Sequence, residues 1–172
     1  FIDRLQLVKQ FQGYSLAALA GVAANASAES AFRFDAAGDP DTKNERDRSI
    51  NYRGKQWCSF GYFQLNVCPT NAEGSRVAKS KGWMSSDGLW KTGGKGEFLK
   101  WIEDLRGINQ LTHVAERLRQ IPLPVETESA YEFGNLMTIK FENPIDATSK
   151  GKQRGATAEK ILEAYKKAKG IQ

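Results

Sequence analysis

One uncharged stretch constrains the fold of this chain more than any other feature. From Gln10 to Ala28 the sequence contains no Asp, Glu, Lys or Arg, and alanine is its commonest residue. Alanine is the best helix former, and small side chains let neighbouring helices approach closely. Ser15 is suited to cap a first turn. We therefore predict a helix from Leu16 to Ser30 that is buried on most sides.

The same stretch has the length of a membrane span, but its composition argues against one. It is interrupted by glutamine, glycine, serine and asparagine and has few large apolar residues. Alanine does little to drive insertion into lipid. No membrane span is expected.

The rest of the chain predicts further helices around one irregular polar lobe. Apolar spacing indicates a long amphipathic helix from Glu97 to Gln120, whose stripe includes Trp101 and Leu105, and Pro122 follows it. Shorter helices are expected over residues 1–12, over about 126–140, and over 157–169 with Thr157 as the cap.

The polar lobe is expected between these helices. Residues 35–56 are turn-rich, which favours a loop or a small irregular β region, and residues 57–67 are aromatic and β-prone. Together, the predicted helices and the polar lobe indicate a mainly α chain of the α+β class. Its 172 residues suit a single domain, 1–172, and the start at Phe1 suggests a fragment of a longer protein.

Charge and cysteine content narrow the function classes only a little. Lys plus Arg is 25 and Asp plus Glu is 20, a net charge of +5 that fits either an ordinary basic surface or an anionic partner. The basic residues are spread out, which is weak evidence for nucleic acid. Cys58 and Cys68 do not form a metal-binding pair with the distant His113, so they are either a disulfide or two buried thiols.

Glu29 raises the main chemical question, because it is an acid near the end of a helix that should be buried. A carboxyl group held against apolar walls loses solvation of its charged form, and the end of a helix adds a negative partial charge. Both effects favour a retained proton and hence a general acid, which can protonate a glycosidic oxygen. A simple rim glutamate is the plainer interpretation.

A second segment of the sequence favours the general-acid interpretation of Glu29 over that of a rim glutamate. Residues 59–65 read Ser-Phe-Gly-Tyr-Phe-Gln-Leu. Gly61 allows a tight bend or close backbone approach. Tyr62 and Phe63 offer flat rings for a sugar, and Gln64 offers both a donor and an acceptor.

Together these motifs resemble the lysozyme-like superfamily, closest to bacteriophage tail lysozymes and the goose-type lysozyme and lytic transglycosylase group. The matching segments are Glu29-Ser30 with Phe32, Gly38-Asp39, the run from Ser59 to Gln64, and Phe-Glu-Asn-Pro at 141–144 with Arg154 in the tail. The loop between Asp39 and Ser59 is longer than in the phage pattern, and Leu65 replaces the usual tryptophan or isoleucine.

The resemblance implies a lysozyme-like fold and a peptidoglycan-cleaving glycosidase of a phage virion. It would act on the MurNAc-GlcNAc β-1,4 bond of the host wall, as a muramidase or a lytic transglycosylase. Its expected partners are glycan strands and other tail proteins, with no nucleic acid, no metal and no organic cofactor. The alternative is a non-catalytic structural or glycan-binding tail module.

The resemblance assigns the site residues by position. Glu29 is the acid. Asp39 is the first choice for the second carboxylate that a hydrolase needs, ahead of Asp41, Asp47 and Glu142, although Asp39 also suits a turn before Pro40. Substrate contacts are expected from Ser59, Gly61, Tyr62, Phe63, Gln64 and Trp57, the last of which could equally be a packing residue.

Overall fold

The computed structural model describes residues 1–43, 45, 47–142, 144 and 146–172. It is an α+β structure that separates into two compact units. Unit 1 comprises Phe1–Phe32 and Leu111–Gln172, and unit 2 comprises Arg33–Gln110.

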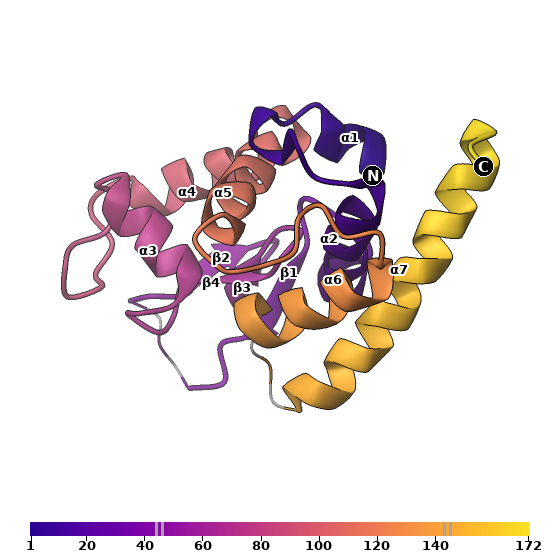
Figure 1. Ribbon diagram of the computed structural model, residues 1–172. Helices are drawn as coiled ribbons and strands as arrows, with labels where there is room; N and C mark the ends of the chain where they lie inside the picture. Colours follow the sequence, from indigo (N-terminus) through magenta and orange to yellow (C-terminus); the bar gives the residue numbers. More distant parts are fainter. Residues whose placement is uncertain (44, 46, 143, 145) are drawn as a thin grey trace. The chain divides into compact units, whose positions relative to one another are not determined.

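Unit 1 is helical and is built around α2 (Leu16–Ser30). The helix has the predicted bounds, and Ser15 caps it, because its Oγ accepts a hydrogen bond from the N–H of Ala18 at 3.0 Å. α6 (Ala130–Met137) and α7 (Ala147–Lys169) pack against α2 and against each other (Figure 1). The other elements are α1 (Ile2–Gln6), a 3-10 turn η1 (Lys9–Phe11) and a π-helical segment η3 (Thr138–Glu142).

Small residues bring these helices into backbone contact. A Cβ placed on Gly21 of α2 would lie 2.8 Å from the backbone nitrogen of Gly134 in α6. A Cβ on Gly134 would lie 3.3 Å from the Cα of Gly155 in α7. The small, alanine-rich residues of α2 are explained by this packing, since larger side chains would separate the three helices.

Unit 2 contains a small antiparallel sheet in the order β1-β3-β2, with β4 also paired to β3. Its strands are β1 (Ala37–Pro40), β2 (Ile50–Tyr52), β3 (Lys55–Phe60) and β4 (Leu65–Asn66). The expected irregular β region is therefore confirmed. A disulfide joins Cys58 of β3 to Cys68 just after β4.

The predicted helix from Glu97 to Gln120 is wrong as a single element. It is two helices, α4 (Gly94–Glu103) and α5 (Ile108–Leu118), separated by the turn η2 (Asp104–Arg106). Leu105 has left-handed backbone angles and is 71% exposed, and Trp101 is only half-buried.

Tertiary contacts explain this break. Gly107 has φ +86° and lies against Tyr62, where a Cβ would come within 2.6 Å of the ring. Three residues later, Gln110 is fully buried and its side-chain oxygen accepts from the N–H of Tyr62 at 2.7 Å. Only glycine adopts this backbone conformation at no cost, so the chain turns at residue 107 despite a continuous apolar pattern.

Two other boundaries differ from expectation. α7 begins at Ala147, so Thr157 lies inside the helix and does not cap it. α3 (Glu73–Ser80) was not predicted, because its sequence is polar and short.

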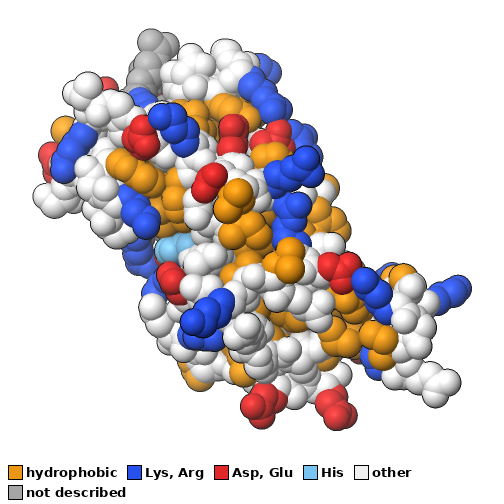
Figure 2. All heavy atoms as spheres, turned by 90° about the horizontal axis from the view of Figure 1, so that it is seen from above, with side chains coloured by type: hydrophobic (Ala, Val, Ile, Leu, Met, Phe, Trp, Pro, Cys, Tyr) orange, Lys and Arg blue, Asp and Glu red, His pale blue; other side chains and the backbone are white. Residues whose placement is uncertain are grey.

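Two further expectations concern the spread of basic side chains over the surface and the membrane-spanning potential of the helices. Lys and Arg side chains lie at many points of the face in Figure 2, with Asp and Glu among them. Among the residues that the structure describes, no helix combines the length and the apolar character needed to cross a membrane.

Candidate active site

Glu29 lies in the last turn of α2, at the point where the helix ends abruptly. The next two residues, Ala31 and Phe32, have left-handed backbone angles with φ of 50° and 63°. The Glu29 side chain is 22% exposed and forms an ion pair with Arg154 of α7, between Oε1 and Nη2. The Glu29 side chain is therefore only partly shielded, and its closest partner is a cation rather than an apolar wall.

Buried polar groups fix the position of Arg154. Its side chain is 9% exposed, and Nη1 donates to Oδ1 of Asn25 at 2.9 Å. Asn25 is fully buried one turn before Glu29, and the same Oδ1 accepts from Thr138 Oγ1 at 2.9 Å. The amide nitrogen of Asn25 donates to the carbonyl of Gly21 at 2.9 Å. This saturated network holds the guanidinium beside Glu29.

A second carboxyl group, that of Glu142, interacts electrostatically with Glu29 and Arg154. Glu142 ends η3, is half-buried, and its Oε1 has no exposed surface and no hydrogen-bond partner among the described residues. Burial and, less strongly, the negative charge of Glu29 raise the pKa of Glu142 and Arg154 lowers it, for a net value of about 8. Asn25, Glu29, Thr138, Glu142 and Arg154 are called the Glu29 cluster below.

The Glu29 cluster thus holds two carboxyl groups and one guanidinium. At neutral pH the raised pKa keeps Glu142 protonated, while Glu29 accepts the charge-assisted bond from Arg154. Such an arrangement can hold and release one proton, which is the chemistry that a general acid requires.

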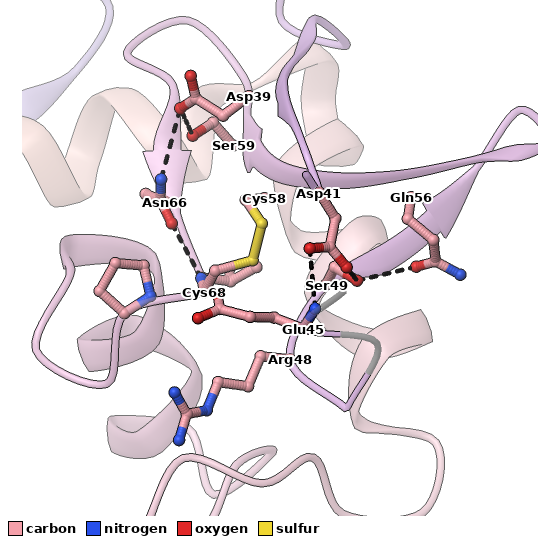
Figure 3. Close-up of a disulfide and its surroundings, with 12 residues drawn as sticks. Asp39, Asp41, Glu45, Arg48, Ser49, Gln56, Cys58, Ser59, Asn66 and Cys68 are labelled. Atoms are coloured by element: carbon pink, nitrogen blue, oxygen red, sulfur yellow. Dashed lines mark hydrogen bonds between the residues drawn. A yellow bond between two sulfur atoms is a disulfide. The ribbon is translucent and has the colours of Figure 1, made fainter. Parts of the chain in front are cut away.

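Asp39 lies in unit 2, within a separate polar group at the sheet. Oδ2 of Asp39 accepts hydrogen bonds from Ser59 Oγ and from Asn66 Nδ2, the latter at 3.4 Å (Figure 3). Asp39 has φ +53°, and β1 pairs with β3 at Gly38 and Ser59. The β-pairing brings Asp39 and Ser59 together, as expected if both belong to one site.

Gln64 belongs to the same side of unit 2. Its Nε2 donates to the carbonyl of Gly61 at 3.0 Å, and a Cβ on Gly38 would lie 2.0 Å from its Oε1. Gly61 has φ +84° and faces the Gln110 side chain, so it serves the tight bend that its sequence suggested.

The two aromatic residues of this motif do not fit the role expected for them. Tyr62 and Phe63 are 2% and 3% exposed. The Tyr62 hydroxyl donates to the carbonyl of Arg106 at 3.1 Å, and its ring packs edge-on against Phe34. Rings that are buried in unit 2 offer no flat face to a sugar, so the motif supplies core packing here.

Trp57 is half-buried, and its Nε1 donates to the carbonyl of Tyr52 at 3.2 Å. It lines a cavity of about 320 Å³ with Asp35 and Arg53. Trp57 does not line the larger cavity described next, which adjoins Asp39.

That larger cavity has a volume of about 530 Å³ and lies beside the disulfide. Asp39, Glu45 and Asn66 are among the residues that line it, together with Cys58 and Cys68. Figure 3 shows Glu45 close to the two cysteines. The sulfur atoms are bonded to each other, so they are not thiolate ligands for a metal.

Sequence reasoning named every titratable member of the Glu29 cluster but not their contacts. The sequence places Glu142 among the alternatives for the second carboxylate and Arg154 in the matching tail segment, but predicts no contact of either residue with Glu29. No sequence signal indicates these contacts, because Glu142 and Arg154 lie outside the helices predicted over 126–140 and 157–169. No family model, curated protein or solved structure matches the chain.

Proposed function

We propose that this protein is a peptidoglycan-cleaving glycosidase in which Glu29 is the general acid. The observation that carries the proposal is the Glu29 cluster: a partly shielded carboxyl group at the end of a buried helix, with an adjacent guanidinium and a second carboxyl group, Glu142, whose pKa is raised mainly by burial. The bond cleaved would be the β-1,4 linkage between N-acetylmuramic acid and N-acetylglucosamine.

The chemistry follows from what Glu29 can do with a proton. Protonation of the glycosidic oxygen allows the bond to break through an oxocarbenium-like transition state. A hydrolase then needs a second carboxylate to activate water or to form a covalent intermediate, and Asp39 is the proposed residue. A lytic transglycosylase needs none, because Glu29 takes the proton back from the 6-hydroxyl of the sugar and leaves an anhydro end.

The fold class and the motif order support a lysozyme-like assignment. The support consists of the α+β class, the buried helix with Glu-Ser at its end, and the Gly-Asp and Ser-to-Gln segments in the expected order. Attachment to a phage tail rests on the resemblance alone.

The test is release of soluble fragments from purified peptidoglycan by the wild type and by Glu29→Gln. We expect the variant to lose at least 100-fold in rate, the scale of a lost general acid. Glu159→Gln, an exposed change on α7, is the matched control and should retain full activity. Equal clearing by wild type and Glu29→Gln would refute Glu29 as the acid.

Mass spectrometry of the released fragments separates the two reactions. Reducing ends identify a hydrolase, and we then expect Asp39→Asn to be inactive. Anhydro ends identify a transglycosylase, for which Asp39→Asn should retain most of its rate.

The ion pair itself favours one alternative, a non-catalytic glycan-binding module. A carboxylate paired with a nearly buried arginine can be a purely structural contact. That alternative predicts glycan binding by the wild type without bond cleavage, and equal binding by Glu29→Gln.

A further inference from the structure

We propose that a cavity along α4, called the Trp101 groove below, is a binding site for a neutral β-1,4-linked N-acetylglucosamine chain. The cavity has a volume of about 570 Å³, within the range of roughly 300–1,000 Å³ that ligand pockets occupy. It is lined by Trp83, Trp101 and Leu105 and by polar residues of α4, η2 and the start of α5, all within unit 2. The choice of saccharide rests on the proposed function, whereas binding at the groove does not require cleavage.

Helical spacing and one close backbone contact form the groove. Glu97, Trp101 and Asp104 are four and three residues apart, so they lie on one face of α4 and its continuation into η2. At the other end of the helix, Gly94 lies directly against the carbonyl group of Trp83, where a Cβ would have no room. This contact holds Trp83 beside the first turn of the helix whose last turn carries Trp101.

The two indole rings supply the flat apolar surface. Trp83 and Trp101 are both half-buried. The ring centroid of Trp101 lies 6.1 Å from that of Phe98, which is fully buried, so the core supports this indole while part of it lines the groove. A pyranose ring has an apolar C–H face that can pack on such a surface, with its hydroxyl groups at the edge.

The turn after α4 provides an independent observation. Leu105 has φ 46° and ψ 36° and is 71% exposed, although left-handed angles are unfavourable for a bulky side chain. The contact of Gly107 with Tyr62 explains the turn at residue 107 but not an exposed leucine two residues earlier. An unfavourable backbone conformation that places an apolar side chain at a cavity is typical of a ligand contact.

The polar residues of the groove are a mixed set of donors and acceptors. Lys100 Nζ donates to Glu97 Oε1 at 3.0 Å, and Asn109 Nδ2 donates to Asp104 Oδ2 at 3.1 Å. A carboxylate offers about four acceptor positions, so one such bond leaves others for the hydroxyl groups of a sugar. Lys100 and Asn109 can in turn donate to an acetamido carbonyl group.

The charges of the groove favour a neutral ligand. Three carboxylates, of Glu97, Glu103 and Asp104, and the ammonium group of Lys100 line it. The excess of carboxylates repels an anion. A cation would compete with Lys100 for Glu97 and would leave the donors of the groove without a function. A neutral sugar uses both the donors and the acceptors.

NMR of the four indole N–H groups tests the site with tri-N-acetylchitotriose, which lacks the bond that the proposed enzyme cleaves. We expect the signals of Trp83 and Trp101, each assigned by its loss in a Trp→Phe variant, to shift and saturate as the trimer is added. The Trp90 signal should not move, because its Nε1 already donates to the carbonyl of Arg48 at 2.6 Å. Unmoved signals of Trp83 and Trp101 overturn the proposal, as do shifts produced by tetralysine but not by the trimer.

Leu105→Gly separates the ligand contact from folding. Glycine adopts left-handed angles without steric cost, so the variant should be as stable as the wild type in urea while its affinity for the trimer falls roughly 3-fold or more. Leu7→Ala, which removes an 81% exposed leucine of unit 1, is the matched control and should bind as the wild type does. Unchanged affinity in Leu105→Gly overturns the assignment of Leu105 to the site.

The outcome is distinguishable from that of the proposed function. Trimer binding at the Trp101 groove of a protein that cleaves no peptidoglycan overturns the proposed function and leaves the saccharide site standing. Cleavage of peptidoglycan by a protein whose Trp83 and Trp101 signals ignore the trimer overturns the saccharide site alone.

Discussion

The stability of the protein should fall as pH rises from 5 to 8, and Glu142→Gln should remove that dependence. In the unfolded chain a glutamate loses its proton near the ordinary pKa of 4.5, whereas in the folded protein burial and Glu29 hold the pKa of Glu142 at about 8. Between these two values the folded state binds one more proton than the unfolded state. Stability from this group is therefore complete below pH 4.5 and is lost as pH rises to 8.

The magnitude follows from the two pKa values. At about 1.36 kcal/mol for each pH unit, the interval from 4.5 to 8 corresponds to about 5 kcal/mol. Glu142 is only half-buried as a residue, so this figure is an upper limit. From pH 5 to pH 7 we expect the wild type to lose up to about 2.7 kcal/mol more than the variant.

Urea unfolding at pH 5, 6, 7 and 8 measures this difference for the wild type, Glu142→Gln and the exposed control Glu159→Gln. Neutral glutamine resembles a protonated glutamate, so wild type and Glu142→Gln should be similarly stable at pH 5 and the variant should be the more stable at pH 8. The control should follow the wild type. Parallel curves for wild type and Glu142→Gln would refute the argument that the folded state holds the extra proton.

The remaining predictions concern stability. Asn25→Ala should cost about 3 kcal/mol in urea unfolding, because it leaves buried polar partners unsatisfied; a cost below 1 kcal/mol would contradict the network. Gly134→Ala should lower stability by about 1–3 kcal/mol by separating helices, whereas Gly96→Ala in α4, where a Cβ meets nothing within 4 Å, should raise it by about 0.5–1 kcal/mol; equal effects would argue against close packing. Replacing Cys58 and Cys68 by serine should cost about 2–3 kcal/mol for a crosslink between residues 10 apart, and an unchanged Tm would contradict that.

The sequence predicts those parts of the structure whose local signals and tertiary contacts agree. Helix α2 has the predicted bounds because its cap, its alanines and its burial all favour the same helix. The break at Gly107 could not be predicted, because the apolar pattern continues through Leu105 and the turn depends on contacts with Tyr62 and Gln110. Those contacts join residues that are far apart in the sequence.

The candidate site was likewise predictable only in part, because the sequence indicates the residues but not their contacts. The type and position of Glu29 were enough to suggest an acid, and the β-rich region brought Asp39 beside Ser59. The charge environment was not predictable, since a helix-end glutamate gives no sign of an arginine 125 residues later. Burial of Tyr62 and Phe63 was missed because aromatic residues near a motif look alike whether they pack inside or face a ligand.

The long sequence separation within the Glu29 cluster has a consequence for synthesis of the chain. Asn25 leaves the ribosome well before its partners Thr138 and Arg154, which follow it by 113 and 129 residues. At roughly 5–20 residues per second, α2 waits on the order of ten seconds for the helices that cover it. A chain truncated before Arg154 would leave that alanine-rich surface uncovered and Glu29 without its arginine partner, so an incomplete product should be prone to aggregate.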